Sequence, residues 1–268
     1  GGGPGAPGAA RGRRPERSAR AAFGTPEPPV WEALVAAPGV ALNAASDPAL
    51  RSLVWLDFRL AVAFFVVAPL LLLGAGVVAS AQSGAKDDDV LRVTSGYWQA
   101  SSLLLITVML NIAGLPIGAL TAFAAQLLIP LSLWFWDDLN LAIAGGGGAL
   151  RAGFQAWRWV ATLVGVAGAA TQVPFLRCAT AAEPGALRGD AECAAWLEPP
   201  TLFRDLLAPW LSDDVAAQAG LLGLLTYCSY ALYLVAVILP RTGRRGLAVR
   251  PGFTWLAPLQ WLGLASTD

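Results

Sequence analysis

The sequence contains no histidine and one methionine, and only 13% of its 268 residues are charged. Histidine is the commonest metal ligand and general base in proteins, so its absence argues against zinc hydrolases, histidine-ligated haem and Ser-His-Asp catalysis. Soluble proteins contain about 25% charged residues. Basic and acidic residues number 18 each, so net charge does not favour nucleic acid as a partner. These deficits predict a membrane protein that is not an enzyme and needs no metal.

Apolar sequence takes the place of the missing charge, with 56% hydrophobic residues and 11 tryptophans. The longest uncharged run extends from Gln99 to Trp136 and has 38 residues, whereas one membrane helix needs about 20. Other apolar segments cover residues 58–79, 157–175 and 216–239. The pattern predicts an all-α, polytopic membrane fold, and lipids are expected partners.

The distribution of charge predicts how the long run is divided. Seven arginines lie before or at the start of the first span, and a basic tail over residues 241–268 follows the last. The loop over residues 177–215 has three arginines against seven acidic residues, a net charge of −4. The positive-inside rule then puts both termini on the same side, opposite the acidic loop, which requires an even number of spans.

We therefore expect four spans. The second covers residues 98–118, breaks at Pro116–Gly118 and continues as a tilted or interfacial helix over residues 120–136. A hairpin that turns within residues 114–118 and crosses twice is sterically attractive, but it gives five spans.

Residues 1–50 form a basic arm rich in proline and glycine, too poor in apolar residues near its start to build a core. Its many arginines and few acids resemble the end of an organelle transit peptide, and a plain disordered arm is an equal alternative. The chain does not begin with methionine, so we expect a processed or incomplete chain.

Two of the three cysteines, Cys178 and Cys193, lie in the acidic loop. If that loop faces an oxidising compartment, the pair is expected to form a disulfide, the alternative being two free thiols. A metal site is not expected, because further histidine or cysteine ligands are missing nearby. Cys228 lies within the last span and is expected to be a small buried apolar residue.

The amide side chains Asn111, Gln126 and Gln172 fall within the predicted spans. Such groups either bond across helices or line a substrate path. No acidic or basic residue is expected deep in a span, which favours the role in helix packing.

Charged and aromatic residues at the ends of the predicted spans form a second set of candidates. These are Asp57, Arg59, Trp134, Trp136, Asp137, Asp138 and Asn140. They either mark the ends of the helices at the membrane surface or form a polar cluster that grips a partner's loop or a lipid head group.

Several blocks of the chain resemble a family of small membrane proteins of cyanobacteria and plastids whose function is unknown. They are SLVWLDFRLA (52–61), YW (97–98) with ASSLL (100–104), PLSLWFWDDLN (130–140), WRW (157–159), PFLRC (174–178), and Cys193 with WLEPP (196–200). The SLWFWDDLN block is the most distinctive. The resemblance covers about residues 50 to 245.

This resemblance implies an integral protein of a chloroplast membrane, the thylakoid or the inner envelope, with both termini in the stroma. We expect a non-enzymatic accessory, scaffold or assembly subunit of a larger complex; the alternative is a small carrier or channel for a neutral solute or lipid, built on the broken helix at Pro116. No cofactor is required, although chlorophyll or carotenoid would be compatible. Without histidine, the candidate pigment ligands are Gln99, Asn111, Gln126 and Asn140.

Overall fold

The structure is a computed structural model that describes residues 1–3, 47–83, 88–181 and 186–246. Most of the predicted N-terminal arm and of the basic tail lies outside these residues. All the regular secondary structure within them is helical, which confirms the predicted all-α class.

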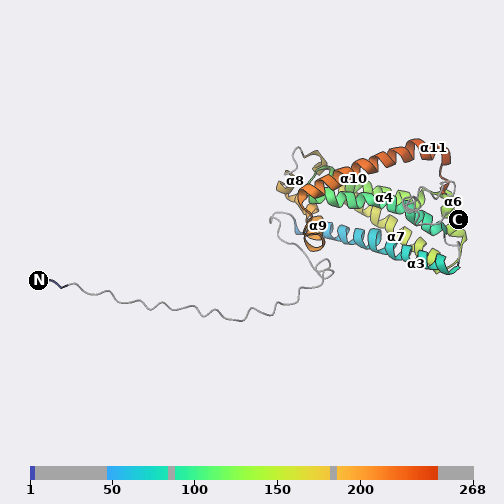
Figure 1. Ribbon diagram of the computed structural model, residues 1–268, viewed down its shortest axis with the longest axis horizontal. Helices are drawn as coiled ribbons and strands as arrows, with labels where there is room; N and C mark the ends of the chain where they lie inside the picture. Colours follow the sequence, from blue (N-terminus) through green and yellow to red (C-terminus); the bar gives the residue numbers. More distant parts are fainter. Residues whose placement is uncertain (4–46, 84–87, 182–185, 247–268) are drawn as a thin grey trace, which may run out of the picture.

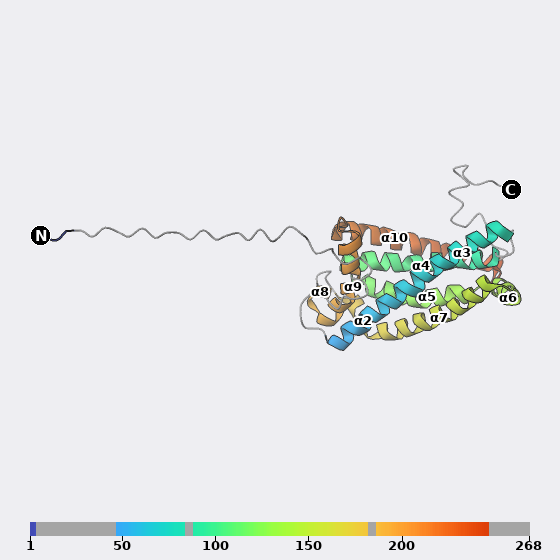
Figure 2. The same ribbon diagram turned by 90° about the horizontal axis from the view of Figure 1, so that it is seen from below.

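Long helical segments lie side by side along the bundle (Figures 1 and 2). They are α2 (Pro48–Ala61), η1 (Val62–Val67) and α3 (Ala68–Ser83); α4 (Asp88–Ile112); α5 (Ile117–Trp134); α7 (Ala149–Gln172) with η3 (Val173–Thr180); and α10 (Asp213–Tyr233) with η4 (Leu234–Ile238) and α11 (Leu239–Thr242). Short helices lie at the two ends: α6 (Asp137–Gly145), α8 (Ala186–Gly189) and α9 (Ala191–Leu207). Among the described residues, five helices are long and apolar enough to cross a membrane.

A proline explains the π-helical turn in the first long helix. Pro69 has no N–H to bond the carbonyl of Phe65 four residues earlier, and η1 lies just before it. The Phe65 carbonyl instead accepts a hydrogen bond from the Tyr97 hydroxyl at 2.5 Å, and the Phe64 carbonyl accepts one from Trp157 Nε1 at 2.8 Å. Neighbouring helices therefore satisfy backbone groups near the bend, as proline in a membrane helix requires.

The long uncharged run forms a helical hairpin. Gly114 has a φ of 67°, a left-handed conformation that favours glycine, and Pro116 precedes α5. Across the hairpin, Thr107 donates to Thr121 between their hydroxyls at 2.9 Å. The expected four spans with a tilted or interfacial second helix thus become five candidate spans, because the sharp turn lays α5 back along α4 and buries residues such as Ile129 and Leu133.

The bundle has two distinct ends. The start of α2, η3, α8, α9 and the start of α10 lie together at what we call the disulfide end. The last turn of α3, the starts of α4 and α7, α6 and α11 lie at the opposite end. The first described helix begins at one end and the last finishes at the other, so five crossings by the candidate spans would give an odd number where charge counting predicts an even one.

The main apolar core lies toward the opposite end. It contains Phe65, Val90, Val93, Tyr97, Ile129, Leu133, Leu139, Ile143, Phe154, Trp157 and Ala161. Helix α10 is peripheral, with no buried residue in its most apolar 18-residue stretch. Cys228 is exposed on this helix, contrary to the expected burial, because α10 contacts α4 along only part of its circumference.

Candidate functional site

A buried polar cluster joins three helices near the disulfide end. Gln126 on α5 donates from Nε2 to Asp57 Oδ1 at 3.4 Å, and Gln172 on α7 donates from Nε2 to Asp57 Oδ2 at 3.2 Å. The two glutamines are only 2% and 6% exposed. Two of the three amides predicted within the spans, Gln126 and Gln172, therefore bond across helices to the same carboxylate. The third, Asn111, is not part of this cluster.

Asp57 was expected at the entrance of the first span, but the structure puts it within a continuous helix. Helix α2 starts at Pro48, ten residues before the predicted span, because the Asp47 side chain accepts from the Ala49 amide and caps it. Residues of this first turn pack against α9 instead of entering lipid. In the described part of the chain, no lysine or arginine forms an ion pair with Asp57.

Two glycines on α7 make room for the cluster. A Cβ atom at Gly168 would lie 2.6 Å from Gln126 Nε2 and 2.7 Å from Asp57 Oδ1. One at Gly165 would lie 2.7 Å from Pro130 Cγ and 2.8 Å from the Gln126 carbonyl oxygen. Small residues thus let α7 approach α5 closely, as is common between membrane helices. The oxygens Oε1 of Gln126 and Gln172 are buried without a protein partner.

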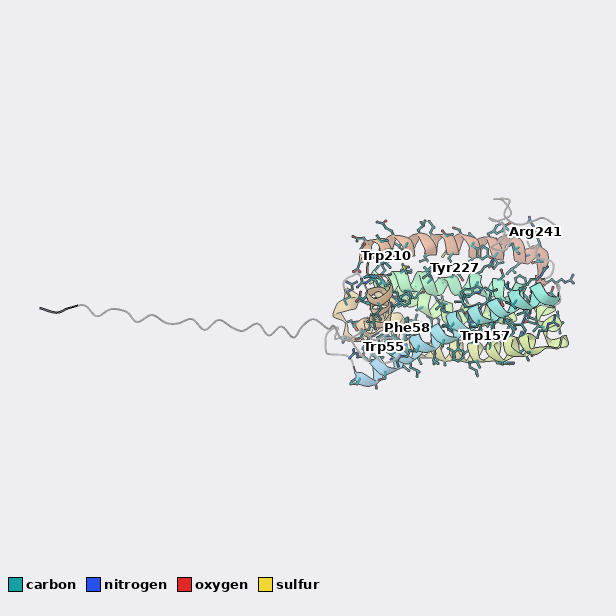
Figure 3. All side chains as sticks on the ribbon, turned by 60° about the horizontal axis from the view of Figure 1, so that its bottom comes forward. Trp55, Phe58, Trp157, Trp210, Tyr227 and Arg241 are labelled. Carbon is teal, nitrogen blue, oxygen red and sulfur yellow. A yellow bond between two sulfur atoms is a disulfide. The ribbon has the colours of Figure 1, made fainter. Side chains whose placement is uncertain are left out.

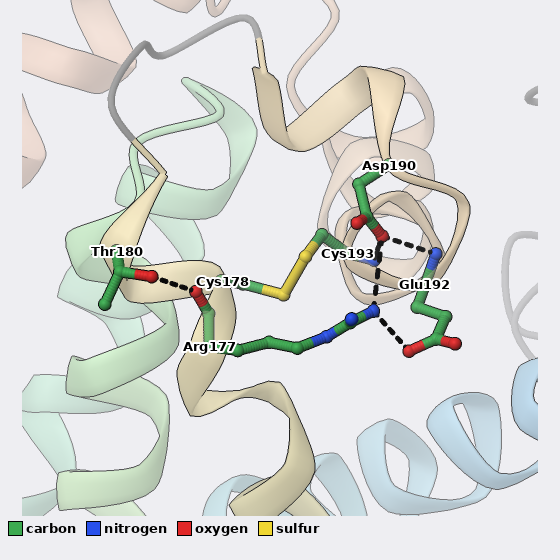
Figure 4. Close-up of a disulfide and its surroundings, with 6 residues drawn as sticks. All are labelled: Arg177, Cys178, Thr180, Asp190, Glu192 and Cys193. Atoms are coloured by element: carbon green, nitrogen blue, oxygen red, sulfur yellow. Dashed lines mark hydrogen bonds and ion pairs between the residues drawn. A yellow bond between two sulfur atoms is a disulfide. The ribbon is translucent and has the colours of Figure 1, made fainter.

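The predicted disulfide between Cys178 and Cys193 is confirmed, with their Cα atoms 5.9 Å apart (Figure 4). It joins η3 to the first turn of α9. Asp190 caps α9 by accepting from the amides of Glu192 and Cys193 at 3.0 Å each. Arg177 contacts both Asp190, at 3.6 Å, and Glu192. The Cys193 amide above all, with the Glu192 amide and the Arg177 charge, holds the pKa of Asp190 below its usual range.

A half-buried ion pair that the sequence did not reveal ties α2 to α9. The Arg51 guanidinium lies 3.1 Å from the Glu198 carboxylate, and Trp55 Nε1 donates to the same carboxylate at 3.4 Å. Glu198 is 5% exposed. Figure 3 shows Trp55 near this end of the bundle. Arg51 and Glu198 are distant in sequence and lie outside the predicted spans, so the sequence pattern alone assigns both to loops.

A small, partly open cavity of about 30 Å³ lies between the disulfide and the polar cluster. Its lining includes Asn111, Gln172, Trp196 and both disulfide cysteines. A shallow depression at the opposite end, about 470 Å³, is lined by both acids and bases: Asp137, Asp138, Leu141, Arg244 and Arg245.

The aromatic block at the end of the long run has a structural role at the opposite end. Trp136 has an extended backbone conformation, with φ −88° and ψ 100°, which separates α5 from α6. Trp134 Nε1 donates to the Thr162 hydroxyl at 2.8 Å. The Arg158 guanidinium lies 3.9 Å from the centre of the Trp134 ring and donates to Asn140 Oδ1 at 2.5 Å. These contacts fix α6 and α5 against α7.

The two aspartates of the block hold the segment after α11. Asp137 pairs with Arg244 at 2.8 Å, and the Arg244 carbonyl accepts from the Asp137 amide at 3.1 Å. Asp138 Oδ1 accepts from the amides of Leu139 and Gly246 at 2.8 and 2.7 Å. Arg244 also donates to the carbonyls of Phe135 and Trp134, at 2.9 and 3.3 Å. The block therefore binds the chain's own residues 244–246.

The remaining candidates lie apart from these clusters. Arg59 lies over the Trp55 ring, 5.8 Å from its centre. Among the candidate pigment ligands, Gln99 Oε1 accepts from the Tyr230 hydroxyl at 2.6 Å, and Asn140 Oδ1 is held by Arg158 as described. Gln126 is buried and donates to Asp57 as described. The described residues contain no group of three or more metal-ligating acids or cysteines.

The fold defines a helical integral membrane protein with a polar cluster inside its bundle. One end of the bundle is covered by η3, α8 and α9, which we call the cap and which the disulfide links. The chain belongs to DUF3177, a family of proteins of unknown function, which matches over residues 51–247. The match begins within the first turn of α2 and ends just after Gly246, so it covers nearly the whole described bundle. No curated protein and no solved structure shows significant similarity to the chain.

Proposed function

We propose that this protein is a non-enzymatic accessory, scaffold or assembly subunit of a larger complex in a photosynthetic membrane. The observation that carries the proposal is the peripheral position of α10, whose apolar circumference is largely exposed while its other side contacts α4. Leu221, Leu222, Leu225 and Leu232 on this helix, and Val235 on the following η4, are each at least 50% exposed. Such a face can pack against the helices of another membrane subunit.

The internal polar groups support a structural role. Asp57, Gln126 and Gln172 bond to one another across three helices, and Arg51 with Glu198 fastens the cap. These contacts fix α2, α5, α7 and α9 relative to one another and so stabilise the outer surface of the bundle. A carrier for a neutral solute has less support. Small-molecule sites are concave and measure about 300–1,000 Å³, whereas the cavity inside the bundle measures only about 30 Å³. The depression of about 470 Å³ is shallow and lies on the surface of the opposite end.

The photosynthetic membrane enters the proposal through the resemblance to proteins of cyanobacteria and plastids. We propose that the disulfide end faces the oxidising side, the thylakoid lumen or the intermembrane space, because disulfides persist in such compartments. The opposite end, which carries Arg92, Arg151, Arg158 and the arginines after α11, would face the stroma, as the positive-inside rule favours. The start of α2 would then lie on the oxidising side, which differs from the expectation of two stromal termini.

The free thiol of Cys228 offers a direct test, because it is exposed on α10 and the other two cysteines are bonded to each other. A thiol-reactive photo-crosslinker attached there in native membranes should join α10 to one defined membrane protein, identified by mass spectrometry. The same protein should co-migrate with this chain on native gels after mild detergent extraction. The variant Cys228→Ser provides the control and should give no adduct. Migration only as a monomer or homodimer, without a defined adduct, would contradict the proposal.

A further inference from the structure

The cavity behind the disulfide has walls of mixed character. Phe175, Leu187, Leu197 and the two cysteines supply apolar surface, whereas Asn111, Gln172 and Trp196 carry polar groups. A genuinely empty cavity in a protein is lined by apolar groups, while a polar cavity that can hold a water molecule is normally hydrated.

Two of the polar side chains that line the cavity have a hydrogen-bonding atom with no protein partner. Gln172 uses its Nε2 to donate to Asp57, and its Oε1 is left as a buried acceptor. Trp196 Nε1 is a buried donor without an acceptor. Leaving such groups unbonded is unfavourable, and one donor with one acceptor around a small space is the arrangement that a water molecule satisfies.

The volume agrees with this occupant. A cavity holds a water molecule when its volume is at least about 10–15 Å³ on the same measure, so about 30 Å³ suits one or two. An organic ligand is excluded by the size. The Asn111 amide supplies a further polar partner on the wall, and an internal water usually has about three.

We propose that this cavity is a binding site for internal water, in which a water molecule accepts from Trp196 Nε1 and donates to Gln172 Oε1. The site extends the polar cluster into a continuous chain, from Trp196 on α9 through water and Gln172 to Asp57 on α2 and Gln126 on α5. Hydrogen bonding thereby links the disulfide-held cap to the interior of the membrane bundle. This inference is independent of the proposed partner-binding function.

The test uses the full chain in detergent micelles, labelled with ¹⁵N-tryptophan in a deuterated background. Trp196→Phe removes one indole peak and so assigns it. The Trp196 indole N–H should then show a nuclear Overhauser cross-peak to the water resonance. Trp157 is the matched control, because its Nε1 is bonded to the Phe64 carbonyl inside the core, and it should show none.

A second variant separates this site from general solvent entry. Gln172→Leu removes the acceptor and should abolish or strongly reduce the Trp196 cross-peak, with the indole peak still present. The exposed Trp210 indole provides the positive control for detecting solvent contact. A wild-type protein in which Trp210 contacts water and Trp196 does not would overturn the proposal. A second result would also overturn it: a Trp196 indole peak that shows no cross-peak to water and changes its chemical shift when sodium replaces choline in the buffer. A cation would then occupy the cavity in place of water.

Discussion

Replacement of Gly165 by alanine tests whether close helix contact holds the polar cluster together. The new Cβ would lie 2.7 Å from Pro130 Cγ and 2.8 Å from the Gln126 carbonyl oxygen, whereas ordinary contacts to a Cβ begin near 3.4 Å. One neighbour is a proline ring and the other is backbone, so neither can turn aside. Helices α5 and α7 must therefore move apart by a few tenths of an ångström or more.

The expected change follows from two opposing effects. Alanine in place of glycine in a helix stabilises by about 1 kcal/mol, and overpacking a well-filled interface destabilises by about 1–3 kcal/mol. Separation of the helices also lengthens the hydrogen bonds from Gln126 and Gln172 to Asp57, which adds to the loss. We expect a net destabilisation of about 1–2 kcal/mol for Gly165→Ala.

The same helix offers a matched control. A Cβ at Gly153 would have its nearest neighbour, Leu72 Cδ2, at 3.9 Å, so Gly153→Ala gains the helix propensity without a clash. Thermal unfolding in detergent, followed by tryptophan fluorescence, should show a lower Tm for Gly165→Ala and an unchanged or higher Tm for Gly153→Ala. Equal Tm values for the two variants would refute the claim that α7 lies too close to α5 at Gly165 to admit a Cβ atom.

Three further predictions concern the two ends of the bundle. Replacing Cys178 and Cys193 together by alanine should destabilise the cap by about 3 kcal/mol in the chain-entropy model, measured by denaturant unfolding; no loss would contradict a stabilising disulfide. Because its pKa is held low, the Asp190 carboxylate contributes stability that is present above its unfolded-state pKa, near 4, and lost as the pH falls through the lowered value. Asp190→Asn should therefore flatten the dependence of Tm on pH below about pH 4, and a profile identical to wild type would contradict this account. Asp138→Ala removes the acceptor for the Gly246 amide, so trypsin should cleave after Arg245 several-fold faster; an unchanged rate would show that this segment is held by other contacts.

The sequence predicted the helical class because long uncharged segments can be buried only in lipid. It predicted the disulfide because both cysteines lie in one acidic loop, and the structure bears this out. It also identified Gln126 and Gln172 as groups that bond between helices. These conclusions depend on composition and local spacing, which tertiary contacts do not alter.

Only the tertiary structure showed that the long run folds into a hairpin, which gives five candidate spans, and where Asp57 lies. Charge counting could not show that Gly114 and Pro116 fold the long run back on itself, because the stability of that hairpin comes from packing along α4 and α5. Charge counting also could not show that the first helix begins at Pro48. Arg51 in its first turn pairs with Glu198 on α9, a residue far along the chain. From the sequence, the aromatic block was expected to mark helix ends or to grip a partner's loop or a lipid head group, whereas its aspartates bind the chain's own residues 244–246. Local pattern determines which segments are helices, whereas partners distant in sequence determine which face each helix buries.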